Sequence, residues 1–505
     1  MATSILLVAV QFGSLLVSAS STLFYGGTII AFEEGTESLD VIRNGSILVT
    51  NDRIAAVSSD WIMDNLPSDA DKVDITGQII TPGFVDTHRH TWMTAFKTIA
   101  SNSTIVDFFA RYGEFAAASS FLPEDVYLGQ LAGLYETLNG GVTTILDHAH
   151  HTWSNATAYA GLNASVESGA RVFWGYTFHN ISSLNYTIAD QIPNFHEIAR
   201  GGILNGTATE LGIAFDAWGP DPNVQETQAI VDLAREYNVS VITSHCLAGP
   251  WGITNQPEDL HAFGILNDTI PVVLSHGDFL TAQGADLLRS TNQYISMIPE
   301  GHMLYGHPSD RMFITQDQMA LGVDTHFVYS PDLLTQARMW LQASRYNFYM
   351  AVFKHWQIPA HNPMSVAQAF KLATRAGGLA LRRPDLGVIQ VGAKSDLVIW
   401  NARESPSMLG WVDPVAAIVL HANIGDILHV MVNGKFVKKD GKMLARDYQN
   451  VRDRFQASAE RIQSIWRNKP IPAPSWSASD YQLQEPIQVD TRRGIGTGYD
   501  ELFLS

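Results

Sequence analysis

Short apolar runs recur between residues 79 and 384, and helical stretches separate them. Eight runs are present, at 79–87, 143–147, 171–178, 210–215, 240–244, 271–275, 293–299 and 321–324. Most are continuously apolar rather than alternating, which is typical of parallel strands buried on both faces. The intervening segments predict helices, for example over 124–139, 224–237 and 282–290. Eight such strand–helix units predict an α/β fold, a (β/α)8 TIM barrel over 79–384.

Strand-rich segments flank the predicted barrel on both sides. Before it, residues 22–32, 45–50 and 53–57 combine β-forming residues with turn residues. After it, residues 386–399, 416–420 and 427–437 have the same character. Because domain termini commonly lie close together, we expect residues 20–78 and 385–444 to form one composite β-sandwich domain from both chain ends. Residues 445–505 are predicted to be a polar helix followed by a tail.

Composition excludes several classes of function. The 505 residues include 32 Lys and Arg against 50 Asp and Glu, for a formal net charge of −18. A nucleic-acid binder needs the opposite sign, and so does a protein held on anionic membranes. The one cysteine, Cys246, excludes an internal disulfide and cysteine-based metal clusters. It follows His245 directly, so on a strand its thiol would point into the barrel wall as a buried structural group.

An uncharged apolar run at 5–19 ends in Val17-Ser18-Ala19. Small residues at this spacing fit a signal-peptidase site, so residues 1–19 are predicted to be a signal peptide cleaved before Ser20. No Lys or Arg precedes the run. The alternative is a buried first strand or helix of the fold.

Asn-X-Ser/Thr sequons are more frequent than the roughly three or four that chance placement would give. They begin at Asn44, Asn102, Asn155, Asn163, Asn180, Asn185, Asn205, Asn238 and Asn267. Together with the apolar run they predict a secreted or secretory-pathway glycoprotein that is free of the membrane after signal removal. The alternative is a cytoplasmic protein.

Histidines fall at the carboxyl ends of predicted strands. His88 and His90 end the first run, and residues i and i+2 of a strand point to the same face, so their imidazoles can share one metal ion. Alone, such a pair is as easily two solvent-facing loop histidines. His245, His276 and Asp324 end the fifth, sixth and eighth runs. Because these strand ends form one rim, the five side chains predict a site for Zn²⁺, with Fe²⁺ or Mn²⁺ as alternatives.

With these residues in place, the chain resembles the amidohydrolase superfamily, in its cytosine-deaminase and triazine-hydrolase branch. The resemblance covers about residues 22–444 and rests on ITPGFVDTHRH, SHC, LSHG and LGVD. A further signature, Gly387-X4-Gly392-X3-Asp396-Leu397-Val398, follows the barrel. The resemblance implies a metal-dependent barrel with a composite β-sandwich, and a homo-oligomer.

The resemblance also implies roles for individual residues. The metal ligands would be His88, His90, His245 and Asp324. His276 would lie beside the water that the metal activates. Asp324 is further predicted to be the general base, because it ends a strand beside the metal, so that one carboxylate oxygen can bind the metal while the other faces the water. Binuclear relatives carry a carboxylated lysine at the end of strand four, whereas the fourth run here, ELGIAFDAWGP, has none. One metal per chain is therefore predicted, with a bridging Asp216 as the alternative.

Deaminases of this branch have a glutamate three residues after the strand-five histidine, which moves protons to the leaving amine. Here that position is Ala248, and alanine cannot transfer a proton. Either another group does this work, with Glu300, His302 and His307 as candidates, or the leaving group does not need the proton.

Five residues at the predicted rim are candidates for binding the substrate. They are Trp92, His150, His179, Glu300 and His302. For the histidines at 148, 150 and 151, which end the second run, a hydrated polar loop is an equal alternative. The segment 330–336, which opens a helix over 335–349, resembles the turn after the Asp ligand in the same branch.

The sequence favours a metal-dependent hydrolase that uses an activated water on a carbon–nitrogen bond of a small molecule, such as a cyclic amidine, an amide or an amino-heterocycle. The missing glutamate motivates a second hypothesis, a metal-dependent lyase or isomerase of a secondary-metabolite pathway. A third is a non-catalytic relative. The complete five-residue constellation argues against this third hypothesis, because a scaffold needs no metal ligands.

Overall fold

The computed structural model describes residues 20–33, 35, 38–59, 66–251, 254–267, 269–469 and 486. The predicted signal peptide lies outside these residues. Across the part of the chain that is described, no helix combines the length and hydrophobicity needed to cross a membrane.

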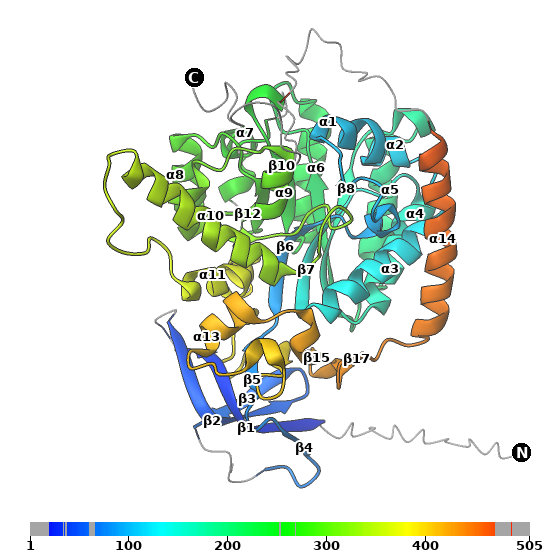
Figure 1. Ribbon diagram of the computed structural model, residues 1–505. Helices are drawn as coiled ribbons and strands as arrows, with labels where there is room; N and C mark the ends of the chain where they lie inside the picture. The colour runs from blue at the N-terminus through cyan, green and yellow to red at the C-terminus, as the bar shows by residue number, and fades with distance from the viewer. Residues whose placement is uncertain are drawn as a thin grey trace, which may run out of the picture.

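Eight parallel strands form the predicted barrel (Figure 1). In chain order they are β6 (Phe84–Arg89), β7 (Val142–Ala149), β8 (Arg171–Phe178), β9 (Thr209–Phe215), β10 (Ile242–Cys246), β11 (Val272–His276), β12 (Tyr294–Met297) and β13 (Met319–Leu321). The residues after β13 return to β6, where Asp324 N donates to the His88 carbonyl oxygen at 2.8 Å. The structure therefore confirms the predicted fold class.

The first apolar run, 79–87, is two strands rather than one. β5 (Ile79–Pro82) belongs to a second sheet, and β6 begins the barrel. Gly83 separates them at a point where the chain passes close to β7, because a Cβ at Gly83 would lie only 2.1 Å from Thr143 Oγ1. A continuous run of apolar residues does not reveal this change of sheet.

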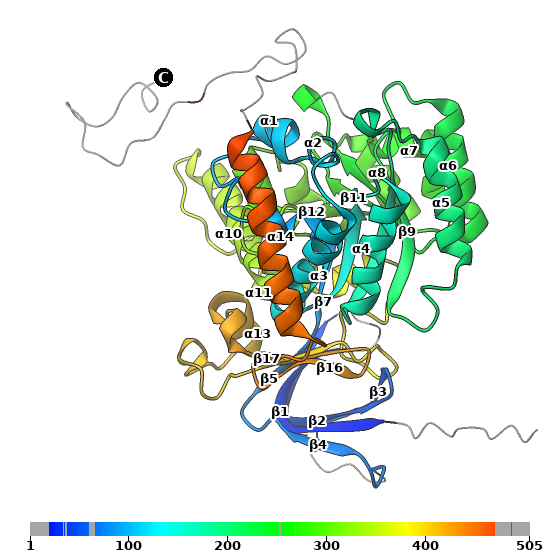
Figure 2. The same cartoon turned by 90° about the vertical axis from the view of Figure 1, so that its right-hand side faces the viewer.

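The second sheet is mixed and draws its strands from both ends of the chain, as predicted. Its other strands are β1 (Ser21–Phe32), β2 (Leu39–Thr50), β3 (Arg53–Ser58), β4 (Asp71–Asp74), β14 (Leu397–Trp400), β15 (Ile427–Val432), β16 (Lys435–Lys439) and β17 (Lys442–Met443). β5 pairs with β1 on one side and with β14 on the other, which joins the two parts. Figures 1 and 2 show this sheet at one end of the barrel.

One predicted strand of this module, 416–420, is helical. It lies in α13 (Pro414–Ala416) and the π-helical turn η9 (Ala417–His421). The Asp413 side chain caps the helix by accepting from the backbone N–H groups of Val415 and Ala416 at 2.9 and 3.1 Å. Proline at the first helical position favours the same start. These capping signals outweigh the β-forming residues of the segment.

Helices surround the barrel (Figure 2). They are α3 (Pro123–Asn139), α4 (Asn155–Glu167), α5 (Ile188–Arg200), α6 (Val224–Tyr237), α7 (Pro257–Ala262), α8 (Ala282–Thr291), α9 (Pro299–Tyr305), α10 (Leu333–Phe353), α11 (Val366–Ala373) and α12 (Arg375–Ala380). The predicted helices at 124–139, 224–237 and 282–290 correspond to α3, α6 and α8, and the one at 335–349 lies within α10.

The tail helix α14 (Tyr448–Asn468) packs on α3 and on η1 (Thr91–Phe96), the segment that follows His90. Its Trp466 ring lies 4.8 Å from the Phe96 ring, and Gln463 Nε2 donates to the carbonyl oxygens of Ala95 and Lys97 at 3.1 Å. α14 therefore reinforces the segment directly after the predicted metal ligands.

The connection between β6 and α3 carries two further short helices, α1 (Ile105–Asp107) and α2 (Glu114–Ala117), with the π-helical turn η2 (Phe108–Tyr112) between them. Figures 1 and 2 show α1 and α2 at the end of the barrel away from the mixed sheet. This connection is longer than most βα loops, which have about 2–6 residues. It therefore contributes side chains of its own above the barrel.

Candidate metal centre and active site

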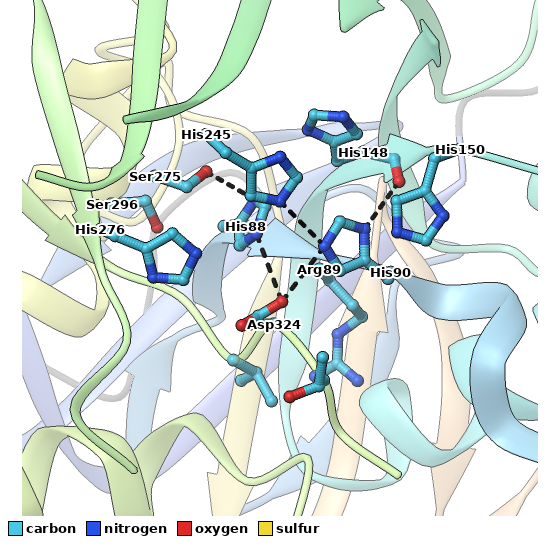
Figure 3. Close-up of polar contacts among 12 residues, drawn as sticks. His88, Arg89, His90, His148, His150, His245, Ser275, His276, Ser296 and Asp324 are labelled. Carbon is cyan, nitrogen blue, oxygen red and sulfur yellow. Dashed lines mark hydrogen bonds and ion pairs between the residues drawn. The ribbon is translucent and has the colours of Figure 1, made fainter. Parts of the chain in front are cut away.

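The four predicted ligands meet at the carboxyl end of the barrel. His88 Nε2 and His90 Nε2 lie 3.4 and 3.2 Å from the same oxygen, Asp324 Oδ1. His90 Nε2 also lies 3.2 Å from His245 Nε2. Figure 3 shows the three rings and the carboxylate pointing toward one another. Three imidazole nitrogens and one carboxylate oxygen around one point are a ligand set for a divalent ion such as zinc.

The second nitrogen of each ligand histidine is held by a neighbour. These neighbours are the Ser275 hydroxyl, 2.7 Å from His88 Nδ1, the His148 carbonyl, 3.0 Å from His90 Nδ1, and the Asp216 carboxylate, 2.8 Å from His245 Nδ1. Such contacts turn the Nε2 atom of each ring toward the common point. His88 Nε2 is buried and has no hydrogen-bond partner among the described residues, which fits a position reserved for a metal ion.

The charge states of His88 and Asp324 also suit a cation. Burial lowers the pKa of His88 to about 4, so the ring is neutral at physiological pH, the form that binds metals. Burial alone would raise the pKa of Asp324, but His88 and His90 outweigh it and hold that pKa well below its usual range. The centre thus combines a neutral imidazole with an ionised carboxylate.

Asp216, at the end of β9, positions His245. Its carboxylate accepts from the backbone N–H of His245 at 2.7 Å and from the Ser244 hydroxyl at 3.1 Å, and it lies 3.3 Å from His148 Nε2. Burial disfavours a charged His245, but Asp216 outweighs burial and raises the pKa of His245 to about 9. Because Asp216 contacts Nδ1 rather than Nε2, the geometry supports an orienting role over the bridging alternative.

Two of the predicted rim residues have strained backbones. His276 has φ of 75° and Asp324 has φ of 63°, both in the left-handed region that side chains other than glycine rarely adopt. Strain of this kind persists where the surroundings enforce it and clusters at functional sites. It aims both side chains at the centre, because ligand atoms of His88, His276 and Asp324 all lie within 4.8 Å of one another.

Behind His276 lies a chain of buried polar side chains. His276 Nδ1 lies 3.3 Å from His302 Nε2, and the His307 ring stacks on the His276 ring at 5.0 Å. His307 Nδ1 in turn lies 2.6 Å from Asp278 Oδ2. Burial holds the pKa values of His276 and His302 well below 6.5, so both rings are neutral. They can therefore donate or accept a hydrogen bond without gaining charge.

A cavity of about 590 Å³ opens above the centre. Its lining includes His90, His245, His276 and Asp324. The apolar part of the lining consists of Ile105, Phe108, Phe109, Phe115, Phe178, Ile188, Phe215, Leu247 and Tyr305. Such a volume suits a small molecule, and the apolar walls favour a flat, uncharged one.

The predicted substrate-binding residues separate into two groups. His150 and His179 line the cavity, and so does His307. The described cavity lining does not include Trp92, Glu300 or His302.

The three residues outside the lining have other contacts. Trp92 is buried, and its Nε1 donates to His150 Nδ1 at 2.9 Å. Glu300 accepts from Gln336 Nε2 of α10 at 2.9 Å, and His302 lies behind His276. Trp92 and His302 therefore touch residues that line the cavity, whereas Glu300 faces α10. Cys246 is fully buried, as predicted for a structural thiol.

Sequence reasoning missed the contribution of the β6–α3 connection. Ile105, Phe108, Phe109, Glu114 and Phe115 come from this segment and line the cavity. The segment has no strand or helix periodicity that would place these residues. Its length was the available signal, because long connections in compact domains are commonly functional.

Comparison with known proteins agrees with the geometry. The chain belongs to the amidohydrolase family, whose model matches residues 79–437. The similar curated proteins include a 5-methylthioadenosine/S-adenosylhomocysteine deaminase from Pyrococcus horikoshii, which is 25% identical over 81% of this chain and 94% of the relative. A 5'-deoxyadenosine deaminase from Methanothermobacter thermautotrophicus is 26% identical over 85% of this chain and 97% of the relative.

Solved structures share the fold. An adenosine deaminase from Xanthomonas campestris with bound zinc has a TM-score of 0.73 at 18% identity, covering 88% of this chain and 99% of that chain. An atrazine chlorohydrolase from Arthrobacter aurescens in complex with zinc has a TM-score of 0.70 at 18% identity, covering 87% and 100%.

Family membership confirms the resemblance predicted from the motifs. The protein is therefore a metal-dependent hydrolase that acts on carbon–nitrogen bonds other than peptide bonds, as predicted, and its substrate is a small molecule. Its His and Asp group fits the predicted single divalent ion, with zinc as the expected one.

Proposed function

We propose that this protein hydrolyses an exocyclic carbon–nitrogen bond of an uncharged, largely apolar nitrogen heterocycle. One observation carries the proposal: His88, His90, His245 and Asp324 converge at a cavity whose walls are mainly aromatic and aliphatic. A flat heterocycle stacks well on such walls. Its electrophilic ring carbon would then face the polar centre.

The four converging residues would hold the metal ion. When bound, a divalent ion lowers the pKa of a water molecule and polarises the substrate. Asp324 accepts a proton from the attacking water, because its carboxylate is ionised and faces the centre. His276 donates a hydrogen bond to the oxygen that attacks, and its neutral ring is steadied by His302 on the far side.

The cavity wall that comes from the β6–α3 connection favours a free heterocycle over a nucleoside. A ribose carries hydroxyl groups that must find partners when they are buried. Phe108, Phe109 and Phe115, from the β6–α3 connection, form a wall that offers none; Thr177 and Asn180, which could offer them, come from other segments of the lining. Among substrates of the kinds named in the relatives, we therefore expect amino-triazines and amino-purine bases to be preferred over adenine nucleosides.

The test is ammonia release by zinc-loaded enzyme from three probes: an amino-triazine, guanine and 5'-deoxyadenosine. We expect turnover of at least one free heterocycle, with kcat/KM above that of the nucleoside. Running the reaction in H₂¹⁸O should place one labelled oxygen in the product. Reaction of the nucleoside alone would contradict the substrate proposal.

The alternative of a lyase or isomerase is motivated by Ala248, because this position, which usually carries the proton-donating glutamate, has no acidic side chain here. Turnover of a substrate without label from H₂¹⁸O would favour that alternative. A protein that binds zinc but turns over no probe and no wider panel of heterocycles would favour the non-catalytic alternative.

We also propose that the mature chain begins near Ser20, is secreted and is N-glycosylated. All nine sequon asparagines are exposed in the structure, and the first strand, β1, begins at Ser21, just after the predicted cleavage site. Intact mass of protein from its native source should show loss of residues 1–19 and added glycan. A homo-oligomer, tested by light scattering, remains an expectation from the family resemblance.

A further inference from the structure

Two acidic side chains of the cavity lining, Glu114 and Glu226, have no role in the hydrolysis proposed above. Four carboxylates line the cavity: Glu114, Asp216, Glu226 and Asp324. Asp216 is engaged with His245 and His148, and Asp324 with His88 and His90. Both are committed to the centre as anions. Either of the two remaining carboxyl groups, Glu114 and Glu226, could therefore supply a proton to the leaving group.

Glu114 lines the same cavity as His90, His245 and Asp324. It is the first residue of α2, in the connection that follows the His88–His90 strand, and its side chain is half-buried. Its carboxyl group interacts electrostatically with His245, Asp216 and His90. Its neighbour Phe115 lies with its ring 5.8 Å from that of His179 at the cavity wall. Glu114 thus belongs to the wall that the β6–α3 connection adds above the barrel.

The surroundings of Glu114 favour its protonated form relative to a free carboxyl group. Burial raises the pKa of this carboxyl above its usual value, and the nearby Asp216 carboxylate acts in the same direction, against His245 and His90. The other carboxylates at the centre, Asp216 and Asp324, have pKa values well below the usual range. Carboxyl groups with opposed shifts in one site divide into acid and base.

We infer that Glu114 is the general acid that protonates the leaving amine, in place of the glutamate that is absent at position 248, where this chain has alanine. This inference rests on the proposed hydrolysis. Water adds to the ring carbon and gives one proton to Asp324. Glu114 then gives its proton to the amino nitrogen, the carbon–nitrogen bond breaks with its electron pair going to nitrogen, and ammonia leaves. The proton held by Asp324 returns to Glu114 through solvent, so each turnover consumes one water and releases one ammonia.

The decisive kinetic test compares two leaving groups on one ring. Glu114→Gln removes the proton but keeps the shape of the side chain. We expect it to slow ammonia release from an amino-triazine by about 10²–10⁴-fold, the usual contribution of a general acid. Chloride release from the matching chloro-triazine should change less than about tenfold, because chloride leaves without a proton. An equal loss of rate with both probes, or no loss of rate with either probe, would overturn the inference.

Rescue gives a second arm. Adding Ala248→Glu to Glu114→Gln returns an acid three residues after His245, so ammonia release should recover at least tenfold while chloride release stays level. No recovery in a variant that folds and retains zinc would count against the inference. Glu236→Gln, at a surface glutamate paired with Arg200, is the matched control and should leave both rates unchanged. An amine-selective loss in Glu226→Gln instead of Glu114→Gln would assign the acid to Glu226 and overturn the inference.

A spectroscopic arm is independent of substrate and metal. The infrared difference spectrum between wild type and Glu114→Gln at neutral pH should contain the carbonyl band of a protonated carboxylic acid. A carboxylate band there would overturn the inference. If neither triazine reacts with the wild type, the proposed function fails for triazines, and the infrared result still decides whether Glu114 carries a proton.

Discussion

Two groups of buried polar side chains, one at each end of the barrel, differ in how their hydrogen-bonding atoms are satisfied. At the carboxyl end, both ring nitrogens of His151 are buried without a hydrogen-bond partner among the described residues. At the amino end, Arg171 of β8 forms two hydrogen bonds with the Asp396 carboxylate, at 2.9 and 3.2 Å. The same carboxylate accepts from Asn433 N at 2.7 Å.

This difference suggests that the buried polar groups at the amino end serve stability, whereas those at the carboxyl end serve function. A buried group whose partners are all present stabilises one conformation, here the union of the barrel with the mixed sheet that carries Asp396 and Asn433. Buried nitrogens without partners cost free energy and persist where a ligand or a reaction needs them. Substitutions at the carboxyl end should therefore lower activity with little effect on the free energy of unfolding. Substitutions at the amino end should lower the free energy of unfolding with little effect on activity.

The largest effect is expected at Asp324. Asp324→Asn removes the base but keeps the side-chain shape, and asparagine tolerates the positive φ at this position. We expect kcat to fall by at least about 10²–10⁴-fold with little change in melting temperature. Steady-state kinetics on zinc-loaded protein checks this. Near-normal turnover at full zinc occupancy would show that Asp324 is not the base.

At the amino end, Asp396→Ala should act on stability alone. It leaves the buried Arg171 charge without its partner, which costs about 3–5 kcal/mol of unfolding free energy. The exposed Arg289–Asp317 pair is the control, and Asp317→Ala should cost no more than about 1 kcal/mol. Urea unfolding measures both. Loss of kcat in the folded fraction of Asp396→Ala would break the contrast between the two ends.

Asp216→Asn tests how the carboxyl end is oriented. Without the anion beside Nδ1, the His245 ring loses the contact that fixes its position. We expect zinc affinity or kcat/KM to fall by about 10–100-fold. Competition with a zinc chelator gives the affinity. An unchanged affinity together with unchanged kinetics would mean that Asp216 does not position His245.

The unpartnered ring of His151 predicts acid sensitivity. Burial lowers the pKa of His151 to about 3, whereas the unfolded chain has the usual value near 6.5. Below pH 6.5 the unfolded chain binds a proton that the folded chain does not, so stability is present above 6.5 and is lost as the pH falls. Each such group removes about 1.4 kcal/mol per pH unit between these values.

His151→Leu should therefore flatten the dependence of unfolding free energy on pH, between pH 6 and pH 4, by about that amount per unit. Chemical denaturation at several pH values measures the slope. An unaltered slope would show that His151 is not neutral in the folded protein.

Much of the fold was predictable from the sequence. Parallel barrel strands are buried on both faces, so they read as apolar runs, and their ends locate His88, His90, His245, His276 and Asp324 at one rim. The division at Gly83 was not predictable, because it depends on close approach of Thr143 from a distant strand. The helix at 414–421 was missed because the Asp413 cap outweighs β-propensity.

The wall of the cavity was less accessible to prediction. Glu114 and the phenylalanines around it lie in a connection whose path is set by packing against the rest of the rim. Asp216 was visible at the end of the fourth run, but its orienting contact with His245 requires the distance between two strands. Sequence position identified the centre, and only the fold identified what surrounds it.

The central claim is that the carboxyl end holds one metal ion on His88, His90, His245 and Asp324. Elemental analysis of purified wild type and His88→Ala tests it most directly, with the exposed His355→Ala as control. We predict one zinc per chain in the wild type and in His355→Ala, and loss of zinc from His88→Ala. A reproducible two metals per chain, or full zinc content in His88→Ala, would contradict the account.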